Sequence, residues 1–553
     1  QQVTLREGLF SIGDFTFNNC NLLNTITIPS SVISIGNGVF ADCDSLISIS
    51  VNENNPSYKV KNSLLCDRKI KNIISCPSGI SNVVIPNGVT NISDYAFSCC
   101  RILTEVFIPS GIISIGKNAF MGCETLSSVS LPNSISEIGD SAFSGCSCLT
   151  SVEIPNKVKR IKASTFSGCS SLASVKIPDS VTYIEDYAFN SCYTLYDTAT
   201  IPGAKLVDGW AIQSDDSVND DFILEGVRGV AEKAFYKCRK IKKINLVNNI
   251  KSIGKYAFYN CPKLSSVTIN KCESDIDDYA FFWCANLTNL NININEKIGS
   301  EAFSSCESLS DVNINGTLTS IGNNAFSGCS SLNIFFIPNS VTNIGNGAFS
   351  MNTSLTNITF GESIRTVGKQ AFYGCEALSE IHISNLSNWC AIKFADYASS
   401  PFYSERNSVK NLYLNDIRVV DLSIPEDVRQ INDFAFNHCT SIENISIPAS
   451  VTNIGNQCFE TCISLKSLII GNGVCNIGDA AFRWCISLTN AIIGSGVNYI
   501  GEYAFNNCSS LSDIIFMGNS PSYVNEFAFT RLPSSANIYI RSGSIGWGTV
   551  PGF

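Results

Sequence analysis

Apolar residues recur along nearly the whole chain in one short pattern. Its consensus reads I-P-x-x-V-x-x-I-G-x-x-A-F-x-x-C-x-x-L-x-x-V-x-I. The last three positions of LxxVxI alternate, which is the period of a strand with one buried face. The following proline cannot donate to a ladder and ends that strand, and the glycine after the second apolar stretch, VxxI, suits a turn. Each unit therefore predicts a short strand, a second short apolar stretch and a turn.

The AFxxC segment is long enough for one helical turn, with Phe and Cys three residues apart and both facing inward. The Phe defines the register of the repeat, and 13 of its 19 intervals are 23 residues long. Ile212 lies midway in a double interval and is expected to replace a Phe there. The register positions are Phe17, Phe40, Phe97, Phe120, Phe143, Phe166, Phe189, Phe235, Phe258, Phe281, Phe303, Phe326, Phe349, Phe372, Phe402, Phe436, Phe459, Phe482, Phe505 and Phe529.

A unit of 23 residues cannot bury its own apolar side, so units must stack and share one core. The words IPNSVTNIGNGAF (Ile337–Phe349) and IPASVTNIGNQCFETCISL (Ile447–Leu465) carry the pattern with little change. They resemble the leucine-rich repeat class, and within it the BspA-type family of surface proteins.

The resemblance covers almost the whole chain, and it implies a particular architecture. We expect a leucine-rich repeat solenoid over residues 1–536, a curved right-handed stack of about 20–23 rungs of mostly short parallel β-strands and one-turn helical segments. Extended repeats are expected near 52–85, 198–226 and 384–425, and a C-terminal cap at 537–553. The resemblance also implies a non-enzymatic cell-surface or secreted protein of a bacterium or parasitic protozoan, associated with adhesion.

The charge and hydrophobicity of the chain limit the classes of partner that it can bind. The chain is 44% hydrophobic and 15% charged, with a formal net charge of −10, and that sign argues against a nucleic-acid partner, which basic patches would favour. No apolar run approaches 18 residues, so no direct membrane insertion is expected. The start, QQVTLREGLF, lacks a Met and a signal-peptide pattern and suggests a processed chain or a fragment.

Of 25 cysteines, 17 occupy the FxxC position, where stacking predicts a single column. Their Cβ atoms would point the same way and stay about 5 Å apart, whereas a disulfide needs about 3.8 Å. We therefore predict a ladder of buried free thiols rather than disulfides or zinc, which needs converging ligands. Asn352 and Glu405 replace the Cys in two repeats. Cys66 and Cys76 remain a possible pair, and Cys458 and Cys475 take core slots.

The sequence offers little chemistry. The only histidines are His382, expected to face outward from a strand, and His438, which precedes a column cysteine. The acidic run Ser214–Asp221 lacks the spacing of a calcium loop and is interpreted as a solvated hairpin tip. No phosphate loop or hydrolase motif occurs. We expect no enzyme, no cofactor and no metal.

Solenoid proteins bind their partners on the surface formed by the outward-pointing side chains of the strands. At the tenth residue after each Phe most side chains are small and polar, but Ile469, Ile492 and Ile515 form an apolar run on three successive rungs. Exposed loops are the other candidate, although most of their aromatics are expected to pack under their own loops. The further strand-face candidates are Ile334, Phe336, Phe107 (expected to stand alone) and His382, and the loop aromatics are Tyr58, Trp210, Trp389, Phe394, Tyr397 and Tyr403.

Two functions stay open. The first is protein–protein interaction or adhesion through the concave strand face, with a host or microbial surface or extracellular-matrix protein as partner. The second is a structural spacer that presents other domains and has no ligand of its own. Fold alone does not separate them.

Overall fold

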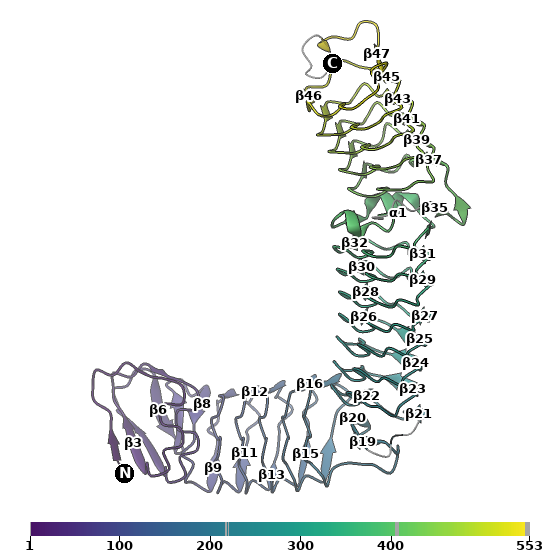
Figure 1. Cartoon of the computed structure of the whole chain (residues 1–553). Helices are drawn as coiled ribbons and strands as arrows, with labels where there is room; N and C mark the ends of the chain where they lie inside the picture. The colour runs from purple at the N-terminus through teal and green to yellow at the C-terminus, as the bar shows by residue number, and fades with distance from the viewer. Residues whose placement is uncertain (1, 216–217, 219–220, 404–408, 548–553) are drawn as a thin grey trace. The chain divides into compact units, whose positions relative to one another are not determined.

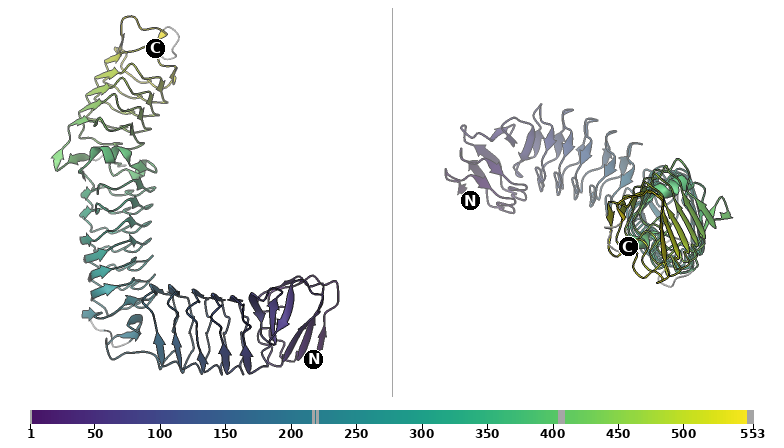
Figure 2. Two further views of the ribbon diagram at one scale, coloured as in Figure 1. Left: turned by 180° about the vertical axis from the view of Figure 1, so that it is seen from behind. Right: turned by 90° about the horizontal axis from the view of Figure 1, so that it is seen from above.

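The computed structural model describes residues 2–215, 218, 221–403 and 409–547 (Figure 1). The chain forms two compact units, which are described separately. The first comprises Gln1–Val218, Leu224–Phe235 and Ile250–Ala257, and the second Asn219–Ile223, Tyr236–Asn249 and Phe258–Phe553. Each unit is a stack of similar turns of chain, with strands from successive repeats side by side (Figure 2).

Most repeats give one strand to each of two columns of parallel strands. The LxxVxI segment supplies the longer strands of what we call the long-strand face, and VxxIG supplies the two-residue strands of the short-strand face. The long-strand face of the first unit consists of β1 (Gln2–Thr4), β3 (Thr25–Ile28), β5 (Ser48–Val51), β9 (Asn82–Val84), β11 (Glu105–Phe107), β13 (Ser128–Val129), β15 (Ser151–Glu153) and β17 (Ser174–Lys176). Its short-strand face consists of β2 (Ser11–Ile12), β4 (Ser34–Ile35), β10 (Asn91–Ile92), β12 (Ser114–Ile115), β14 (Glu137–Ile138), β16 (Arg160–Ile161), β18 (Tyr183–Ile184) and β22 (Gly229–Val230).

The second unit repeats this arrangement. Its long-strand face consists of β21 (Asp221–Ile223), β23 (Lys243–Ile250), β24 (Ser266–Cys272), β25 (Asn289–Ile294), β27 (Asp311–Asn315), β29 (Ile334–Phe336), β31 (Asn357–Thr359), β33 (Glu380–Ile383), β35 (Asn411–Leu414), β37 (Asp421–Ser423), β39 (Asn444–Ile447), β41 (Ser467–Ile470), β43 (Asn490–Ile493), β45 (Asp513–Phe516) and β47 (Asn537–Ile540). Its short-strand face consists of β26 (Lys297–Ile298), β28 (Ser320–Ile321), β30 (Asn343–Ile344), β32 (Thr366–Val367), β34 (Lys393–Phe394), β38 (Gln430–Ile431), β40 (Asn453–Ile454), β42 (Asn476–Ile477), β44 (Tyr499–Ile500) and β46 (Tyr523–Val524).

The core of each stack is a column of phenylalanine rings. Successive rings lie nearly parallel with centroids 4.8–5.8 Å apart, as from Phe258 to Phe372 and from Phe436 to Phe529. This spacing matches the distance between hydrogen-bonded strands, so each ring contacts the ring of the next repeat. The register of the repeat therefore places one aromatic residue per rung in a continuous buried stack.

The AFxxC segment is a run of turns rather than the expected turn of helix. Tyr95 and Cys99, on either side of Phe97, both have positive φ angles near 60°, which a helix does not allow. The Phe97 N–H donates to the carbonyl of Ala119 in the next repeat (2.7 Å), not within its own segment. Hydrogen bonds between successive repeats therefore satisfy the backbone N–H and C=O groups of this segment, as they do in the strands.

The cysteine column forms a hydrogen-bonded ladder as well as a packed one. The thiol of Cys123 donates to the carbonyl oxygen of Phe97, one repeat earlier, at a distance of 3.1 Å. Bonds of this kind, 2.9–3.4 Å long, join column thiols to preceding Phe carbonyls in both units. This position therefore requires a side chain that is small and can donate a weak hydrogen bond, and a cysteine thiol meets both requirements.

The glycine of VxxIG is needed for close approach between repeats rather than for the turn that its position suggested. A Cβ on Gly345 would lie 2.6 Å from the backbone of Gly322 and Asn323 in the preceding repeat. The next residue forms a polar ladder that the sequence reasoning missed: the Asn346 N–H donates to Oδ1 of Asn323 (2.8 Å), and the Lys369 N–H donates to Oδ1 of Asn346 (2.8 Å). Asn or Asp after the glycine thus supplies an acceptor for the next rung.

Irregular elements interrupt the columns in three places. They comprise the antiparallel strands β6 (Tyr58–Lys61), β7 (Leu64–Asp67) and β8 (Asn72–Ser75), the hairpin β19 (Ala204–Val207) and β20 (Trp210–Ser214), and a segment with α1 (Leu386–Ala391), η1 (Tyr397–Ser399) and β36 (Ile417–Arg418). At the C-terminal end, β47 pairs in parallel with β45. Residues 548–553 of the expected cap lie outside the described part.

Two expectations about single core residues, Ile212 and Cys475, were wrong, and the Cys66–Cys76 pair that the sequence left open does not form. Ile212 does not replace a Phe, because the antiparallel pairing of β20 turns Trp210 and Ala211 into the core and leaves Ile212 half-buried. Cys66 and Cys76 are both free thiols, and Cys76 lies against Cys100 of the column rather than against Cys66. Cys475 is exposed, whereas Cys458 is buried as expected.

A matched pair of phenylalanines tests the role of the ring column. Phe326→Ala should lower the free energy of unfolding by about 3–5 kcal/mol, because it removes a fully buried ring from the stack. Phe336→Ala, ten residues away on an exposed strand position, should change it by less than about 0.5 kcal/mol. Urea unfolding of both variants would measure this, and equal effects would contradict the column as the stabilising element.

Thiol labelling tests the cysteine ladder. Burial raises the pKa of Cys146, Cys329 and Cys508 to about 12, so these thiols stay protonated and unreactive at neutral pH. We expect a thiol-specific dye to label the exposed Cys148 and Cys475 quickly in the native protein, and the 20 buried thiols only after denaturation. Mass spectrometry gives the count of labels. Rapid native labelling of the buried column positions would contradict the buried ladder.

Candidate functional site

Four apolar side chains form a continuous row on the long-strand face of the second unit. The strand register pairs Ile469 with Ile492, Ile492 with Ile515, and Ile515 with Tyr539 on β41, β43, β45 and β47. The sequence neighbours of the three isoleucines are buried, because side chains alternate along a strand, whereas all four residues of β47 are exposed. We call these four residues the apolar row.

The apolar row remains partly in solvent. Ile469 is 45% exposed and Tyr539 is 50% exposed, while Ile492 and Ile515 are half-buried between them. The Tyr539 hydroxyl lies against the Asp513 carboxylate, which raises the pKa of the tyrosine. Tyr539 extends the run that the sequence indicated. It is the tenth residue after Phe529 and so obeys the register, but it was missed because residues 537–553 were expected to form a cap.

Two smaller apolar groups lie elsewhere on the strands. Ile334 and Phe336 are both exposed on β29, opposite the polar Asn357 and Thr359 of β31. Phe107 on β11 does not stand alone, because the register places the exposed Val84 of β9 directly opposite it. The extended repeat at 52–85 shifts the spacing, so Val84 was not found by counting from a Phe.

His382 does not project freely from its strand. Its ring stacks on Tyr413 of β35, with centroids 4.5 Å apart and planes within 3°. Its Nδ1 lies 3.0 Å from Oδ1 of Asp416, and its Nε2 lies 3.1 Å from Nδ2 of Asn357. The β35–β36 hairpin therefore covers most of the imidazole, which the sequence placed on an open face.

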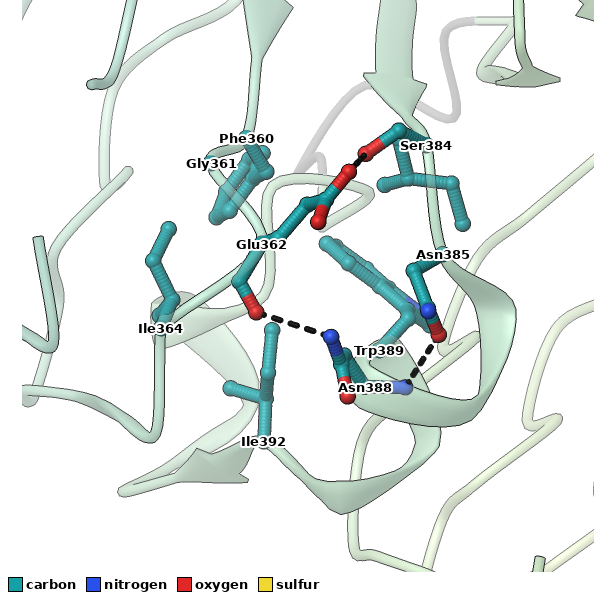
Figure 3. Close-up of a pocket in the computed structure, with 10 residues that line it drawn as sticks. Phe360, Gly361, Glu362, Ile364, Ser384, Asn385, Asn388, Trp389 and Ile392 are labelled. Carbon is teal, nitrogen blue, oxygen red and sulfur yellow. Dashed lines mark hydrogen bonds between the residues drawn. The ribbon is translucent and has the colours of Figure 1, made fainter. Parts of the chain in front are cut away.

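The loop aromatics divide into two groups. Tyr58, Trp210, Trp389 and Phe394 are buried, and Trp389 donates from Nε1 to the carbonyl of Ala435 (2.9 Å). Figure 3 shows the space beside Trp389, with Asn388 donating to the Glu362 carbonyl and Ser384 to its carboxylate. That space has a volume of about 10 Å³, room for one water at most. These aromatics pack under their own loop.

Tyr397 and Tyr403 instead contribute to a larger hollow of about 580 Å³, which we call the aromatic pocket. It also presents His438, whose ring lies edge-on to Tyr403 with centroids 5.5 Å apart. Glu460 accepts from Gln457 Nε2 at 2.6 Å on its floor, and burial raises the pKa of this carboxyl. The pocket is lined by Tyr397, Tyr403, Asn437, His438, Gln457, Glu460, Thr461, Ile463, Trp484 and Ile486.

His438 and Lys410 are titratable groups held in the interior. Burial, together with the smaller effect of the nearby Lys410, lowers the pKa of His438 to about 4, so the imidazole is neutral at pH 7. Burial also lowers the pKa of Lys410 to about 8, and its Nζ donates to the carbonyl of Leu378. Cys439 belongs to the thiol column and bonds to Ser441, so the adjacent Cys and His do not act together.

The described residues were also compared with the requirements of a metal site and of a membrane-spanning helix. Within the described ranges, no group of three or more His, Cys, Asp or Glu side chains is placed to hold a metal ion. Two positions considered for that chemistry, Asp216 and Asp220, lie outside those ranges, as does Glu405. No helix among the residues that the structure describes is long and apolar enough to cross a membrane.

The repeated two-strand rungs, shared apolar core and outward-facing strand residues define a leucine-rich repeat protein. A family model described as BspA type leucine rich repeat region (6 copies) matches residues 1–80, 75–196, 214–296, 274–399 and 408–543. The chain therefore belongs to the BspA-type leucine-rich repeat family, as the repeated words predicted.

The chain is also similar to parts of several solved leucine-rich repeat structures. A leucine-rich repeat protein from Eubacterium ventriosum is 22% identical over 55% of this chain and 64% of its own, with a TM-score of 0.32. A leucine rich cell surface protein from Faecalibacterium prausnitzii is 23% identical, covering 71% and 90% of the two chains with a TM-score of 0.24. The T. pallidum leucine rich repeat protein is 28% identical over 36% and 79%, with a TM-score of 0.23. A search of curated proteins gave no match.

Replacing Lys410 tests the cost of its burial. Because its pKa falls from 10.5 to about 8 on folding, the folded state binds this proton more weakly, so the penalty is full below pH 8 and vanishes above about pH 10.5. Lys410→Met should therefore raise the free energy of unfolding at pH 7 by about 1–4 kcal/mol, and by less at pH 10. Urea unfolding at both pH values measures the difference. Lys157→Met, at an exposed position, is the control, and a less stable Lys410→Met at pH 7 would contradict the assignment.

Proposed function

We propose that this protein is a non-enzymatic cell-surface or secreted protein that mediates adhesion by binding a host or microbial surface or extracellular-matrix protein through its long-strand face. The apolar row carries the proposal. Three isoleucines and a tyrosine occupy corresponding outward positions on four adjacent strands, where most other repeats have small polar residues. Membership of the BspA-type family supports a surface location.

The energetics favour burial of this row by a partner. Fully burying an isoleucine side chain contributes about 1.5–3 kcal/mol, so even partial burial of four neighbouring side chains would supply much of a micromolar affinity of about 8 kcal/mol. Adjacent strands are about 4.8 Å apart, which makes the row continuous enough to act as the central contact of an interface. Clustered exposed apolar side chains of this kind mark protein-interaction sites.

The second candidate is a spacer that presents other domains. The ladders of polar side chains over the remaining strand face favour it, because they satisfy one another: Thr27 bonds Ser50 at 2.7 Å, and Asn313 donates to Asn291 at 3.1 Å. A surface whose polar groups are already paired within the chain gains little from a partner. The two candidates differ in one measurable property, saturable binding.

Binding assays on matrix proteins, mucins and whole cells would separate them. The wild type should bind at least one of these surfaces saturably, and Ile469/Ile492/Ile515→Ser should weaken that binding at least about tenfold while its circular dichroism and unfolding midpoint stay close to wild type. Surface plasmon resonance or a cell-binding assay gives the affinity.

A matched variant controls for the loss of exposed isoleucine. Ile33, Ile102 and Ile113 are also exposed but lie outside the long-strand face, and Ile33/Ile102/Ile113→Ser should bind like the wild type. Equal loss of binding in both triple variants would argue against the apolar row. The absence of any saturable binding by the wild type would favour the spacer.

A further inference from the structure

The aromatic pocket forms where an irregular repeat meets regular ones. Tyr397 and Tyr403 belong to the segment with α1 and η1. Thr461 and Trp484, in contrast, each follow a register Phe by two residues in two successive repeats. The Thr461 N–H donates to the carbonyl of Arg483 (2.7 Å), so these two AFxxC turns lie side by side. The volume of about 580 Å³ lies within the range of small-molecule sites, which is about 300–1,000 Å³.

The walls of the aromatic pocket are largely apolar and remain in contact with solvent. Tyr397, Trp484 and Ile486 are all exposed. The ring centroids of Tyr397 and Tyr403 lie 4.8 Å apart. Covering such side chains releases apolar surface from water, and the face of an aromatic ring carries partial negative charge that attracts C–H groups. The walls therefore suit a ligand that has one face covered with C–H groups.

Hydrogen bonds on the floor of the pocket fix the state of the imidazole. Asn437 Nδ2 donates to the Gln457 carbonyl (3.1 Å) and to Oε2 of Glu460 (3.3 Å). The Asn437 Oδ1 is therefore the acceptor for His438 Nδ1, so the proton of the neutral ring lies on Nδ1. His438 Nε2 consequently has a lone pair and no proton, which makes it a hydrogen-bond acceptor.

The polar atoms that the pocket leaves for a ligand are acceptors. His438 Nε2 and Gln457 Oε1 have no hydrogen-bond partner in the part of the chain that the structure describes. The Glu460 carboxylate adds further lone pairs, because each of its oxygens can accept more than one hydrogen bond. A ligand that covered these atoms without donating to them would cost the free energy of their hydration. The ligand therefore has to bring several hydrogen-bond donors.

The charges beside the pocket oppose a charged ligand. Arg483 Nη1 lies 3.5 Å from Oε1 of Glu460 and offsets the charge of this carboxylate. Lys410 places a second positive charge near His438, where it helps to lower the pKa of the imidazole. One negative group thus lies among two positive ones, so an ammonium or guanidinium ligand gains no net attraction. An anion would meet the lone pairs of the pocket acceptors. The surroundings therefore favour a neutral ligand.

We propose that the aromatic pocket binds a neutral sugar residue. A pyranose ring packs its C–H face on an aromatic side chain, and its several hydroxyl groups donate to the acceptors of the floor. A tyrosine or tryptophan side chain of a protein partner brings a single donor, and an aliphatic side chain brings none. The pocket lies on AFxxC turns, whereas the apolar row lies on β41 to β47. This inference therefore does not rest on the proposed function.

Methyl glycosides of galactose, glucose, mannose, fucose, N-acetylglucosamine and N-acetylgalactosamine are the probes for this site. At least one of them should bind the full chain saturably at millimolar concentration, as measured by saturation-transfer NMR and isothermal titration calorimetry. Trp484→Ala and Tyr397→Ala should each weaken that binding about tenfold or more, because each removes a wall of the pocket. Both side chains are exposed, so the unfolding midpoints of the variants should stay close to that of the wild type.

A second exposed tryptophan supplies the matched control. Trp283 also follows its register Phe by two residues and is 50% exposed, compared with 41% for Trp484, but it does not line the pocket. Trp283→Ala should bind the glycoside like the wild type, and so should Ile469/Ile492/Ile515→Ser. Equal weakening in Trp283→Ala and Trp484→Ala, or no saturable binding of any glycoside, would overturn the pocket as a sugar site. Tighter binding of tetramethylammonium or of N-acetyltyrosinamide than of every glycoside would overturn the sugar as its ligand.

Discussion

The stacking of one aromatic ring on the next, about 5 Å apart, is the interaction on which the rest of this protein depends. Phenylalanines at equivalent positions can stack only if every repeat follows the same path, so each ring fixes the path of its neighbours. The glycine that lets backbones approach, the thiol that bonds to a Phe carbonyl and the Asn ladder all serve this common spacing. A solenoid stabilised in this way depends on contacts between neighbouring repeats.

The same constraint determines where function can lie. The Phe, Cys, Leu and Ile side chains of the consensus are buried in the core and cannot contact a ligand. The buried column thiols have raised pKa values, so they are poor nucleophiles. Outward strand positions and turns are free to vary, because a change there does not disturb the stack. The apolar row is a variation of this kind: it is a short run of repeats whose exposed residues depart from the small polar pattern. Repetition turns such local departures into continuous surfaces, since equivalent residues lie side by side.

In the irregular repeats the column of stacked Phe rings is interrupted, and titratable side chains are buried there. Trp210 is buried where the register Phe is missing, and Trp389 packs edge-on to Phe402 where the chain leaves the two-strand pattern. Around the segment with α1, Lys410 and His438 are enclosed with lowered pKa values, next to a pocket with aromatic walls. Such positions have no equivalent one repeat away, so a periodic sequence pattern carries no information about them.

The sequence by itself determined the solenoid, its 23-residue register, the buried Phe and Cys columns and the adjacency of Ile469, Ile492 and Ile515, because period and stacking translate directly into neighbours. Only the tertiary structure decided that AFxxC forms turns, that Val84 faces Phe107, that the start of the expected cap continues the long-strand face as β47 and that a hairpin covers His382. The physical reason is the same in each case. Spacing predicts contacts while every repeat has the same length, whereas insertions shift the register, and backbone bonds between repeats override the local helical preference.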